Sequence, residues 1–430
     1  MKKIKLDTFL YFNPSESLVG LKEVKKIPLD ALNTNLRKID YFEISKPVGG
    51  AKFRNGDTLV AKITPSLENG KTGLVKILNE GEVGLGSTEF IVLRANEHSD
   101  SNFIYYLARS PMFRERAISL MEGTSGRKRV NESSLRNTDF VLPTLSIQRK
   151  IAHVLSVIDE KIELNIKMND KLEQIAQRIY EYWFLQFDFP DENNNPYSAN
   201  GGNMLYSSEV NYKIPKNWKV KKLSEIIINQ RSGDWGKSTS EKNYSEKVNI
   251  IRGADLNSLL GNKPLKTPER FISEKNLGKQ LEVGDFIVEI SGGGPTQSTG
   301  RIAYINQGVL DRFDLPVLSS NFTKAISLTN ENLLNLFYLY WTKLYESDAF
   351  FKYEGKTSGI KNLLFERFIN ENYIVIPPSE LLFKFENIIK PIFQKIQQNN
   401  LESKKLEDQR DFLLPMLING QINVDNVQID

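Results

Sequence analysis

An internal repeat constrains this chain more than any other feature of its sequence. Four fragments of the first half recur in the second half with small changes. Residues 55–60 (NGDTLV) return at 283–288 (VGDFIV), residues 124–126 (TSG) at 357–359, residues 141–143 (VLP) at 375–377 (VIP), and residues 171–173 (KLE) at 405–407. The offset drifts through the first three pairs and then stays constant, as expected when loops vary in length but a long regular helix does not.

The repeat divides the 430 residues into two globular blocks, each followed by a helical segment. Within each block, short runs rich in Val, Ile, Leu and Phe are bounded by Gly, Pro and Asn, and helical patterns follow them. We therefore predict an α+β fold in which each block is a twisted sheet or partial barrel with a few short helices. The predicted boundaries are 1–144 for the first block, 145–187 for its long helix, 188–210 for a linker, 211–376 for the second block, 377–417 for its long helix and 418–430 for a tail.

The two helical segments carry apolar residues at alternating spacings of four and three, the spacing of a coiled-coil seam. We expect the helices to pack antiparallel through this seam. Its predicted members are Ile158, Ile162, Asn165 and Leu172 in the first helix and Ile392, Ile396, Asn399 and Leu406 in the second. Asn165 and Asn399 hold the same position in the two copies, so they either face each other or are both solvated where the seam weakens. If they face each other, replacing both with leucine should raise stability.

The composition leaves little material for catalysis. There is no cysteine and there are only two histidines, so a cysteine nucleophile, a thiolate metal site or a histidine-based triad is not expected. Three fragments end like a phosphate-binding loop, but Pro65, Arg231 and Phe350 stand where that motif needs its first glycine. These absences predict a chain that is not an enzyme and holds no metal. No apolar run is long enough to cross a bilayer, and no signal segment follows the basic start, so we expect a cytoplasmic chain.

Positive charge points instead to a polyanion partner. Each globular block carries an excess of five basic over acidic residues, whereas the helical segments are balanced. The first block contains a loop, residues 123–129 (GTSGRKR), that combines glycines, hydroxyls and three consecutive cations, and the second block repeats it as residues 355–361 (GKTSGIK). Such a loop can follow a phosphate backbone and reach base edges.

The candidate DNA-binding residues follow from these loops and from other cations expected in loops. In the first block they are Thr124, Ser125, Arg127, Lys128, Arg129, Lys52, Arg54 and Lys62. In the second block they are Lys356, Thr357, Ser358, Lys361, Arg231, Trp235, Lys237 and Arg252. The alternative for each is an ordinary solvated surface charge.

The ordered duplication resembles the specificity subunit of type I restriction-modification systems. The carriers are the repeated block-plus-helix, the opening of the second copy at 214–226 (IPKNWKVKKLSEI), the pair 86–90 (GSTEF) and 319–322 (SSNF), and the TSG stretch before each proline and helix. The first block departs from the pattern, because it has only 24–29 (VKKIPL) where a clear Pro-x-x-Trp opening would stand.

The resemblance implies two target-recognition domains, each reading one half of a bipartite, asymmetric site in double-stranded DNA, held apart by the helices. It also implies two methyltransferase subunits as partners, carrying S-adenosylmethionine and methylating adenine N6, and restriction motor-nuclease subunits that use ATP and Mg²⁺. No cofactor is expected in this chain itself. Two other readings stay open: a specificity chain of a fused restriction-methylation system or an unpaired cassette, and a structural or RNA-binding coiled-coil protein.

Overall fold

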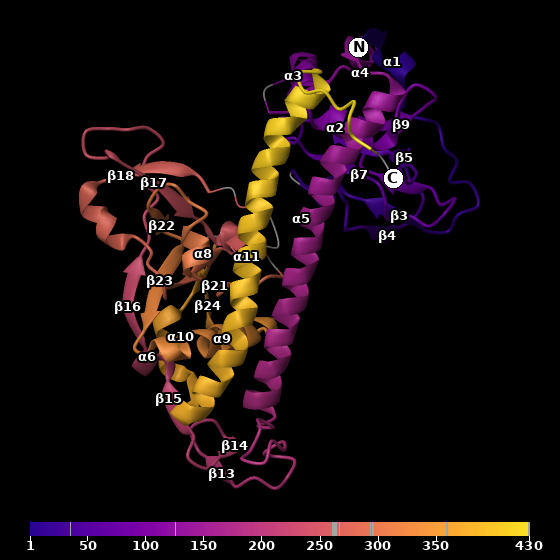
Figure 1. The fold of residues 1–430 in the computed structure, drawn as a ribbon. Coiled ribbons are helices and arrows are strands. Elements are labelled where there is room, and N and C mark those ends of the chain that lie inside the picture. Colours follow the sequence, from indigo (N-terminus) through magenta and orange to yellow (C-terminus); the bar gives the residue numbers. More distant parts are fainter. Residues whose placement is uncertain are drawn as a thin grey trace. The chain divides into compact units, whose positions relative to one another are not determined.

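The computed structural model of the chain describes two compact units (Figure 1). It covers residues 1–34, 36–124, 126–259, 265, 267–292, 294, 296–357 and 360–428, apart from the side chains of Lys356 and Thr357. Unit 1 comprises Met1–Leu164 and Lys405–Asp430, and unit 2 comprises Asn165–Lys404. The long helices α5 and α11 therefore each contribute to both units.

Unit 1 contains two four-stranded sheets and two small strand pairs. The first sheet has the order β2 (Leu10–Phe12), β9 (Phe90–Ala95), β6 (Thr58–Ala61), β7 (Thr72–Leu74). The second has the order β4 (Glu43–Ser45), β3 (Val24–Ile27), β8 (Gly84–Gly86), β5 (Ala51–Phe53). The pairs are β1 (Lys2–Lys5) with β12 (Asp139–Leu142) and β10 (Met121–Glu122) with β11 (Arg129–Val130). All pairings are antiparallel except that of β3 with β8.

Short helices close unit 1 around its sheets. They are α1 (Leu6–Phe9), the 3₁₀ turn η1 (Leu29–Ala31), α2 (Ser101–Arg109), α3 (Pro111–Ser119) and α4 (Glu132–Arg136). Asp100 caps α2 by accepting from the backbone N–H of Phe103, and Ser110 caps α3, which begins with Pro111. Because capping residues satisfy the first free N–H groups of a helix, these two residues fix where α2 and α3 begin.

Unit 2 repeats this layout with longer connections. Its sheets are β16 (Ile227–Ser232), β23 (Thr323–Leu328), β19 (Phe286–Glu289), β21 (Ile302–Tyr304); β18 (Glu269–Ile272), β17 (Glu246–Ile251), β22 (Val317–Ser319); and β20 (Ser291–Gly292), β25 (Ile360–Leu363), β24 (Glu354–Thr357). Two further pairs are β13 (Met204–Ser207) with β14 (Tyr212–Pro215) and β15 (Lys219–Lys222) with β26 (Tyr373–Ile376). The helices are α6 (Leu223–Ile226), η3 (Gly253–Asp255), α7 (Leu256–Leu259), η4 (Glu274–Lys279), α8 (Gln307–Leu310), η5 (Glu331–Leu333), α9 (Leu334–Glu346), η6 (Ala349–Tyr353) and α10 (Phe365–Glu371).

The sequence repeat is also a structural repeat. Thr58 of β6 pairs with Leu93 and Leu74, and Phe286 of β19 pairs with Ile326 and Tyr304 in the same order of strands. Among the described residues the strands form separate sheets and no closed barrel. The predicted α+β class with two duplicated blocks and two long helices is confirmed.

The long helices are α5 (Leu145–Tyr180), continued by a π-helical turn at Glu181–Leu185, and α11 (Ser379–Ile418). In unit 2 they lie side by side and run antiparallel (Figure 1). Asn169 of α5 contacts Asn400, while Trp183, in the π-helical turn that follows α5, packs at a tilt against Phe385 near the start of α11. In unit 1 Asp159 of α5 pairs with Arg410 of α11. Of the predicted seam residues, Ile162, Asn165, Ile396 and Asn399 are buried, and Ile158, Leu172, Ile392 and Leu406 are half-buried.

The seam asparagines are buried, so the solvated alternative was wrong. The amide of Asn165 donates to the backbone oxygen of Asn399 at 3.4 Å, to Glu402 at 2.9 Å and to Ser403 at 3.2 Å. The amide of Asn399 donates to the side chain of Asn169 at 2.9 Å. The two asparagines therefore meet side chain to backbone, and each finds its side-chain partner one layer away along the other helix.

The two units differ in the contact between a short helix and a long helix at one corresponding level. In unit 1 Tyr106 of α2 donates to Asp159 of α5 at 2.7 Å, and Arg410 donates to the same carboxylate at 2.8 Å. In unit 2 the tyrosine at the corresponding place, Tyr338 of α9, packs edge-on against Phe393 at 5.5 Å between ring centroids. Phe393 is buried, because Tyr338 of α9 covers that side of α11.

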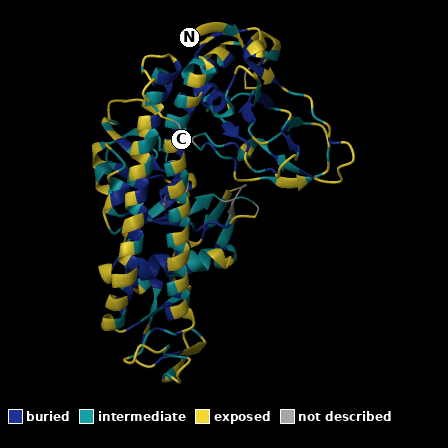
Figure 2. Cartoon of the chain, turned by 45° about the vertical axis from the view of Figure 1, so that its right-hand side comes forward, coloured by how far each residue is buried: buried dark blue, intermediate teal, exposed yellow. Residues whose placement is uncertain are grey.

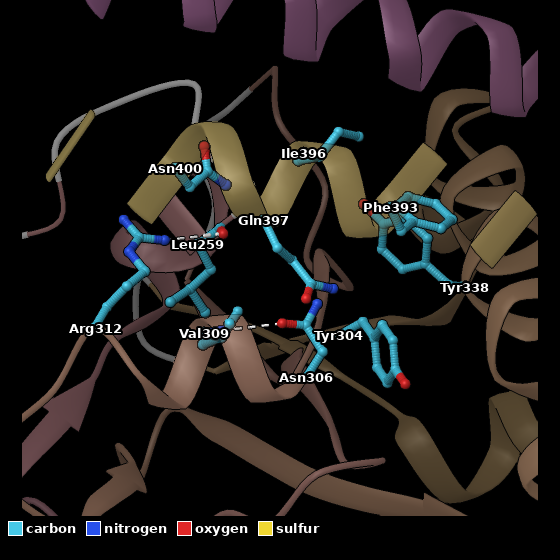
Figure 3. A pocket seen from close by; sticks show the side chains of 11 residues that line it. Leu259, Tyr304, Asn306, Val309, Arg312, Tyr338, Phe393, Ile396, Gln397 and Asn400 are labelled. Atoms are coloured by element: carbon cyan, nitrogen blue, oxygen red, sulfur yellow. Dashed lines mark hydrogen bonds between the residues drawn. The ribbon is translucent and has the colours of Figure 1, made fainter. Parts of the chain in front are cut away.

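Each unit has its own apolar core. Figure 2 colours the buried residues of the chain dark blue. In unit 2, α8 packs closely on α11, and a β-carbon at Gly308 would lie 2.8 Å from that of Gln397. Figure 3 shows this contact: Asn306 caps α8 through Val309, and Arg312 donates to the backbone of Leu259. The cavity left there is about 30 Å³, room for water rather than for a ligand.

None of the helices in the described part of the chain combines the length and the apolar character that a bilayer-spanning segment needs.

Candidate nucleic-acid interface

The cationic loop of unit 1 is anchored at the end of strand β6. The backbone N–H of Lys62 donates to the backbone carbonyl of Glu89 at 2.9 Å, and the carbonyl of Lys62 accepts from the backbone N–H of Val130 at 2.9 Å. The backbone N–H of Thr64 donates to the backbone carbonyl of Lys128 at 3.0 Å. These bonds hold the last residues of the loop beside Lys62 and beside the segment that contains Glu89, so positions far apart in the sequence form one junction.

Unit 2 builds the same junction from its own repeat. The backbone N–H of Ile290 donates to the backbone carbonyl of Phe322 at 3.0 Å, and the carbonyl of Ile290 accepts from the backbone N–H of Leu363 at 2.9 Å. Strand β25, which begins at Ile360, then pairs with β24 and with β20. The predicted equivalence of the two loops therefore rests on matching backbone hydrogen bonds as well as on sequence.

Within the loop of unit 1, the three cations differ in their surroundings. Arg127 and Lys128 are exposed, and their side chains have no ion-pair partner among the described residues. Arg129 donates to Glu89 at 2.7 Å, and this hydrogen bond holds the pKa of Glu89 below its usual range. Thr124 is exposed, and Ser125 lies outside the described residues. Arg127 and Lys128 are thus the loop cations most available to an external anion.

Lys62 is held in a polar set that the sequence did not indicate. Its ammonium donates to Glu132 at 2.7 Å, and Asn13 donates to the other oxygen of the same carboxylate at 2.5 Å. These three side chains line a hollow of about 440 Å³ whose wall also includes Lys52 and Phe90.

Lys52 and Arg54 belong to a neighbouring network around Glu16. Lys52 donates to the backbone of Glu16 at 2.7 Å, and Arg54 donates to its carboxylate at 2.6 Å. Arg94 bridges Glu16 at 2.7 Å to the buried Asp57 at 2.7 Å. Hydrogen bonds from Arg54 and Arg94 lower the pKa of Glu16 to about 2, so this carboxylate stays ionised and fixes both arginines.

In unit 2, two predicted DNA-binding arginines are bound to acidic residues of the fold. Arg231 pairs with the buried Asp285, and Arg252 pairs with Asp255 at 2.8 Å. Asp285 also accepts the N–H of Glu282 at 2.8 Å, as Asp57 accepts that of Arg54 at 2.7 Å. The repeated Gly-Asp motif therefore closes the same turn and holds an arginine in both units.

The remaining candidates of unit 2 lie beside rings or carboxylates. The guanidinium of Arg270 lies 4.3 Å from the ring of Trp235, and Lys237 lies 5.7 Å from that of Tyr244. Lys361 pairs with Glu354 at 3.1 Å and lies 4.7 Å from the ring of Phe351. The backbone of Lys356 and Thr357 belongs to β24, opposite Lys361 and Ile360, and Ser358 lies outside the described residues.

The structure thus brings Lys62 and the end of the cationic loop to one junction in unit 1, and it pairs three of the candidates, Arg54, Lys62 and Arg129, with carboxylates. Sequence reasoning missed the partners, namely Glu16, Glu89, Arg94, Glu132 and Asn13. Only Glu89 had a signal, because it lies in the repeated fragment 86–90. Within the described ranges, no three acidic or histidine side chains gather as a metal site would require. DNA contact by the candidate residues stays a prediction.

Comparison with known proteins agrees with this layout. Residues 23–174 match the type I restriction modification DNA specificity domain. The chain is 26% identical over 338 residues to the type I restriction enzyme MjaIX specificity subunit of Methanocaldococcus jannaschii, a match covering 76% of this chain and 70% of that protein. It is 23% identical over 460 residues to the type I restriction enzyme HindI specificity subunit of Haemophilus influenzae, covering 91% of this chain and 93% of that one.

The fold also has a solved counterpart. The crystal structure of a type I restriction-modification system S subunit from M. genitalium matches with a TM-score of 0.51 at 16% identity, over 97% of this chain and 96% of that chain. At this identity the match speaks for the fold alone. With the duplicated domains, the long helices and the two similar sequences, it leads to one conclusion: the chain resembles type I restriction-modification specificity subunits in sequence and fold, and its residues 23–174 match the DNA specificity domain of these systems.

Proposed function

We propose that this chain is the non-catalytic DNA specificity subunit of a type I restriction-modification complex, in which each globular unit reads one half of a bipartite, asymmetric site. The observation that carries the proposal is the duplicated junction, in which the same backbone hydrogen bonds place a cationic loop beside the end of β6 in unit 1 and of β19 in unit 2. Two similar DNA-reading surfaces on one chain suit a site with two separate halves.

The charges at the junction favour double-stranded DNA over a small anion. Arg127 and Lys128 project without carboxylate partners among the described residues, whereas Arg129, Lys62 and Arg54 are each bound to a glutamate. Free cations can neutralise phosphates and release counterions, and side chains fixed by hydrogen bonds can meet base edges in a defined geometry. A nucleic acid supplies both kinds of partner.

The long helices are the proposed docking surface for two methyltransferase subunits. Large apolar side chains stand exposed along both helices. They are Val157 (51%), Leu164 (50%) and Ile175 (48%) on α5, and Phe383 (65%), Ile388 (42%) and Phe412 (62%) on α11. Exposed apolar residues on helices that already pack against each other mark a surface for further helices.

The partners would supply the chemistry. S-adenosylmethionine is expected on the methyltransferase subunits, which would methylate adenine N6, and ATP with Mg²⁺ on restriction motor-nuclease subunits. The complex would act on cytoplasmic DNA. No observation here favours a fused restriction-methylation chain or an RNA-binding coiled-coil protein.

The salt dependence of DNA binding tests the proposal. Binding of the complex of this chain with its methyltransferase subunits is measured for the wild-type chain and for Arg127→Ala + Lys128→Ala. Each lost phosphate contact should reduce the slope of log affinity against log salt by roughly 0.9. Lys213→Ala + Lys216→Ala removes the same charge from exposed positions in and beside β14 and serves as the control. Equal slopes for all three chains, or tighter binding to folded RNA than to duplex DNA, would contradict the proposal.

A further inference from the structure

Each unit contains a triad of one lysine, one glutamate and one amide beside its junction. In unit 1 it consists of Asn13, Lys62 and Glu132, in which both nitrogens donate to the carboxylate. In unit 2 it consists of Gln230, Lys324 and Glu366, in which Lys324 donates to the amide oxygen at 2.8 Å and to the carboxylate at 3.2 Å. The glutamates stand at the start of α4 and α10, the helices that follow the two cationic loops.

The triads arise from corresponding places but not from corresponding sequence. Asn13 directly follows β2 and Gln230 lies in β16, and these strands pair with β9 and β23 in the same sheet position. The lysines come from different strands, since Lys62 follows β6 whereas Lys324 lies in β23. The two units thus reach the same set of groups in the same region by different routes, which a copied loop sequence alone would not produce.

The fold itself gains little from these contacts. The side chains of Glu132 and Glu366 are 32% and 64% exposed, and ion pairs at such positions contribute little to stability. Helix α4 is already capped by Asn131, which accepts from the N–H of Ser134. The two carboxylates therefore contribute little to the free energy of unfolding, and stability alone does not explain their positions.

The groups of the unit 1 triad are held in fixed positions. The side-chain oxygen of Asn13 accepts from the N–H of Val92 at 2.8 Å, and its backbone N–H donates to Val92 at 2.7 Å. This fixes the amide nitrogen toward Glu132. Lys62 is anchored through its backbone at both sides of the junction. Ordered donors and acceptors lose little entropy when a partner binds.

The charge of the adjoining hollow selects the kind of ligand. Its charged lining consists of two lysines, Lys52 and Lys62, and two glutamates, Glu16 and Glu132. A phosphate entering it would face two carboxylates, whereas the uncharged edge of a nucleobase would find donors and acceptors. Phe90 and Val92 supply an apolar wall.

We propose that the two triads read base edges, one in each half-site, while the exposed cations of the loops hold the phosphate backbone. The carboxylate of Glu132 or Glu366 would accept from the amino group of cytosine or adenine, and the lysine beside it would donate to a ring nitrogen or carbonyl oxygen of a base. This inference rests on the proposed function and adds the residues that set the sequence read.

Selection from a DNA library tests it. The full chain in complex with its methyltransferase subunits is challenged with duplexes of random sequence, in wild-type form and as Glu132→Gln and Glu366→Gln. An amide offers a donor as well as an acceptor, so each variant should lose preference at one position, by roughly 5- to 150-fold for a contact of 1–3 kcal/mol. Glu132→Gln should affect one half-site and Glu366→Gln the other, so each variant is the control for its counterpart.

A structural role would give a different result. It would lower the melting temperature and weaken binding to all sequences alike, with base preference intact, and that outcome overturns the inference. So do unchanged preferences in both variants, or a change in the same half-site from both. Lys62→Met, which keeps the carboxylate, should relax the same half-site as Glu132→Gln if the triad acts as one unit. If the wild-type complex selects no sequence at all, the proposed function fails, and that failure is distinct from selection that the variants leave unaltered.

Discussion

Asp159→Asn should destabilise the chain far more than the loss of an ordinary ion pair. Asp159 is 3% exposed, and its carboxylate accepts from Arg410 at 2.8 Å and from Tyr106 at 2.7 Å. Arg410 is 2% exposed, and Arg37, which donates to Tyr106 at 3.5 Å, is 1% exposed. Asparagine keeps the shape but removes the charge that these guanidinium groups face. Removing one partner of a buried pair costs about 3–5 kcal/mol, a large part of a typical unfolding free energy of about 5–15 kcal/mol.

The assay is chemical denaturation of the full chain, with hydrogen exchange of α2 amides to localise the effect. The matched control is Asp139→Asn, since Asp139 is 42% exposed and pairs with Lys3, itself 71% exposed, at 3.3 Å. That change should cost less than about 1 kcal/mol. Adding Arg410→Met to Asp159→Asn should recover much of the loss, because the guanidinium that has lost its buried carboxylate partner is then gone.

Two results would refute this reasoning. One is a cost for Asp159→Asn that equals the cost of the exposed control. The other is a double variant whose loss is the plain sum of the two single losses, because additivity means that the groups do not interact. Either would show that the buried charges are solvated or paired otherwise.

Three further outcomes are expected. Replacing Asn165 and Asn399 with leucine should lower the melting temperature, because the buried side-chain oxygen of Asn169 loses the hydrogen bond that Asn399 donates, at about 1–3 kcal/mol; a higher melting temperature would restore the expectation from sequence. Burial raises the pKa of Glu386 from 4.5 to about 7. The folded state therefore keeps a proton that the unfolded chain releases, and stability falls as pH rises from about 4.5 to 7. Glu386→Gln should flatten this slope in denaturation curves and add roughly 1–3 kcal/mol at pH 8, and an unchanged slope would contradict the assignment. Inserting four residues after Asn165 lengthens α5 by ~6 Å and should widen the gap between half-sites by about one or two base pairs, read from the methylated motif, with the half-sites unchanged.

The long helices were predictable because their signal is local and periodic. The heptad pattern of α5 and α11 needs only neighbouring residues, and the constant offset between the copies excluded insertions. It identified the face that holds Ile162, Asn165, Ile396 and Asn399, all of which are buried. It could not give the layer at which each residue meets its partner, because heptads fix the face of a helix and leave the axial register open. Asn399 consequently pairs with Asn169 instead of with the side chain of Asn165.

The partners of the candidate site were not predictable, because they come from distant parts of the chain. Lys62 and Glu132 are 70 positions apart, and Arg54 and Glu16 are 38 apart. Charge and loop position select cations in the sequence, but only the folded sheets decide which cation meets a carboxylate. The burial of Phe393 has the same origin, since a helix of the second block covers α11 there.

The central claim, that each globular unit reads one half of a bipartite DNA site, is tested most directly by exchanging one domain. Residues 211–376 are replaced with the corresponding domain of another specificity subunit, and the methylated motif of a host carrying the complete system is sequenced. The account predicts that one half-site is replaced while the other half-site and the gap are retained. A motif that stays unchanged, or in which both halves change together, would contradict it.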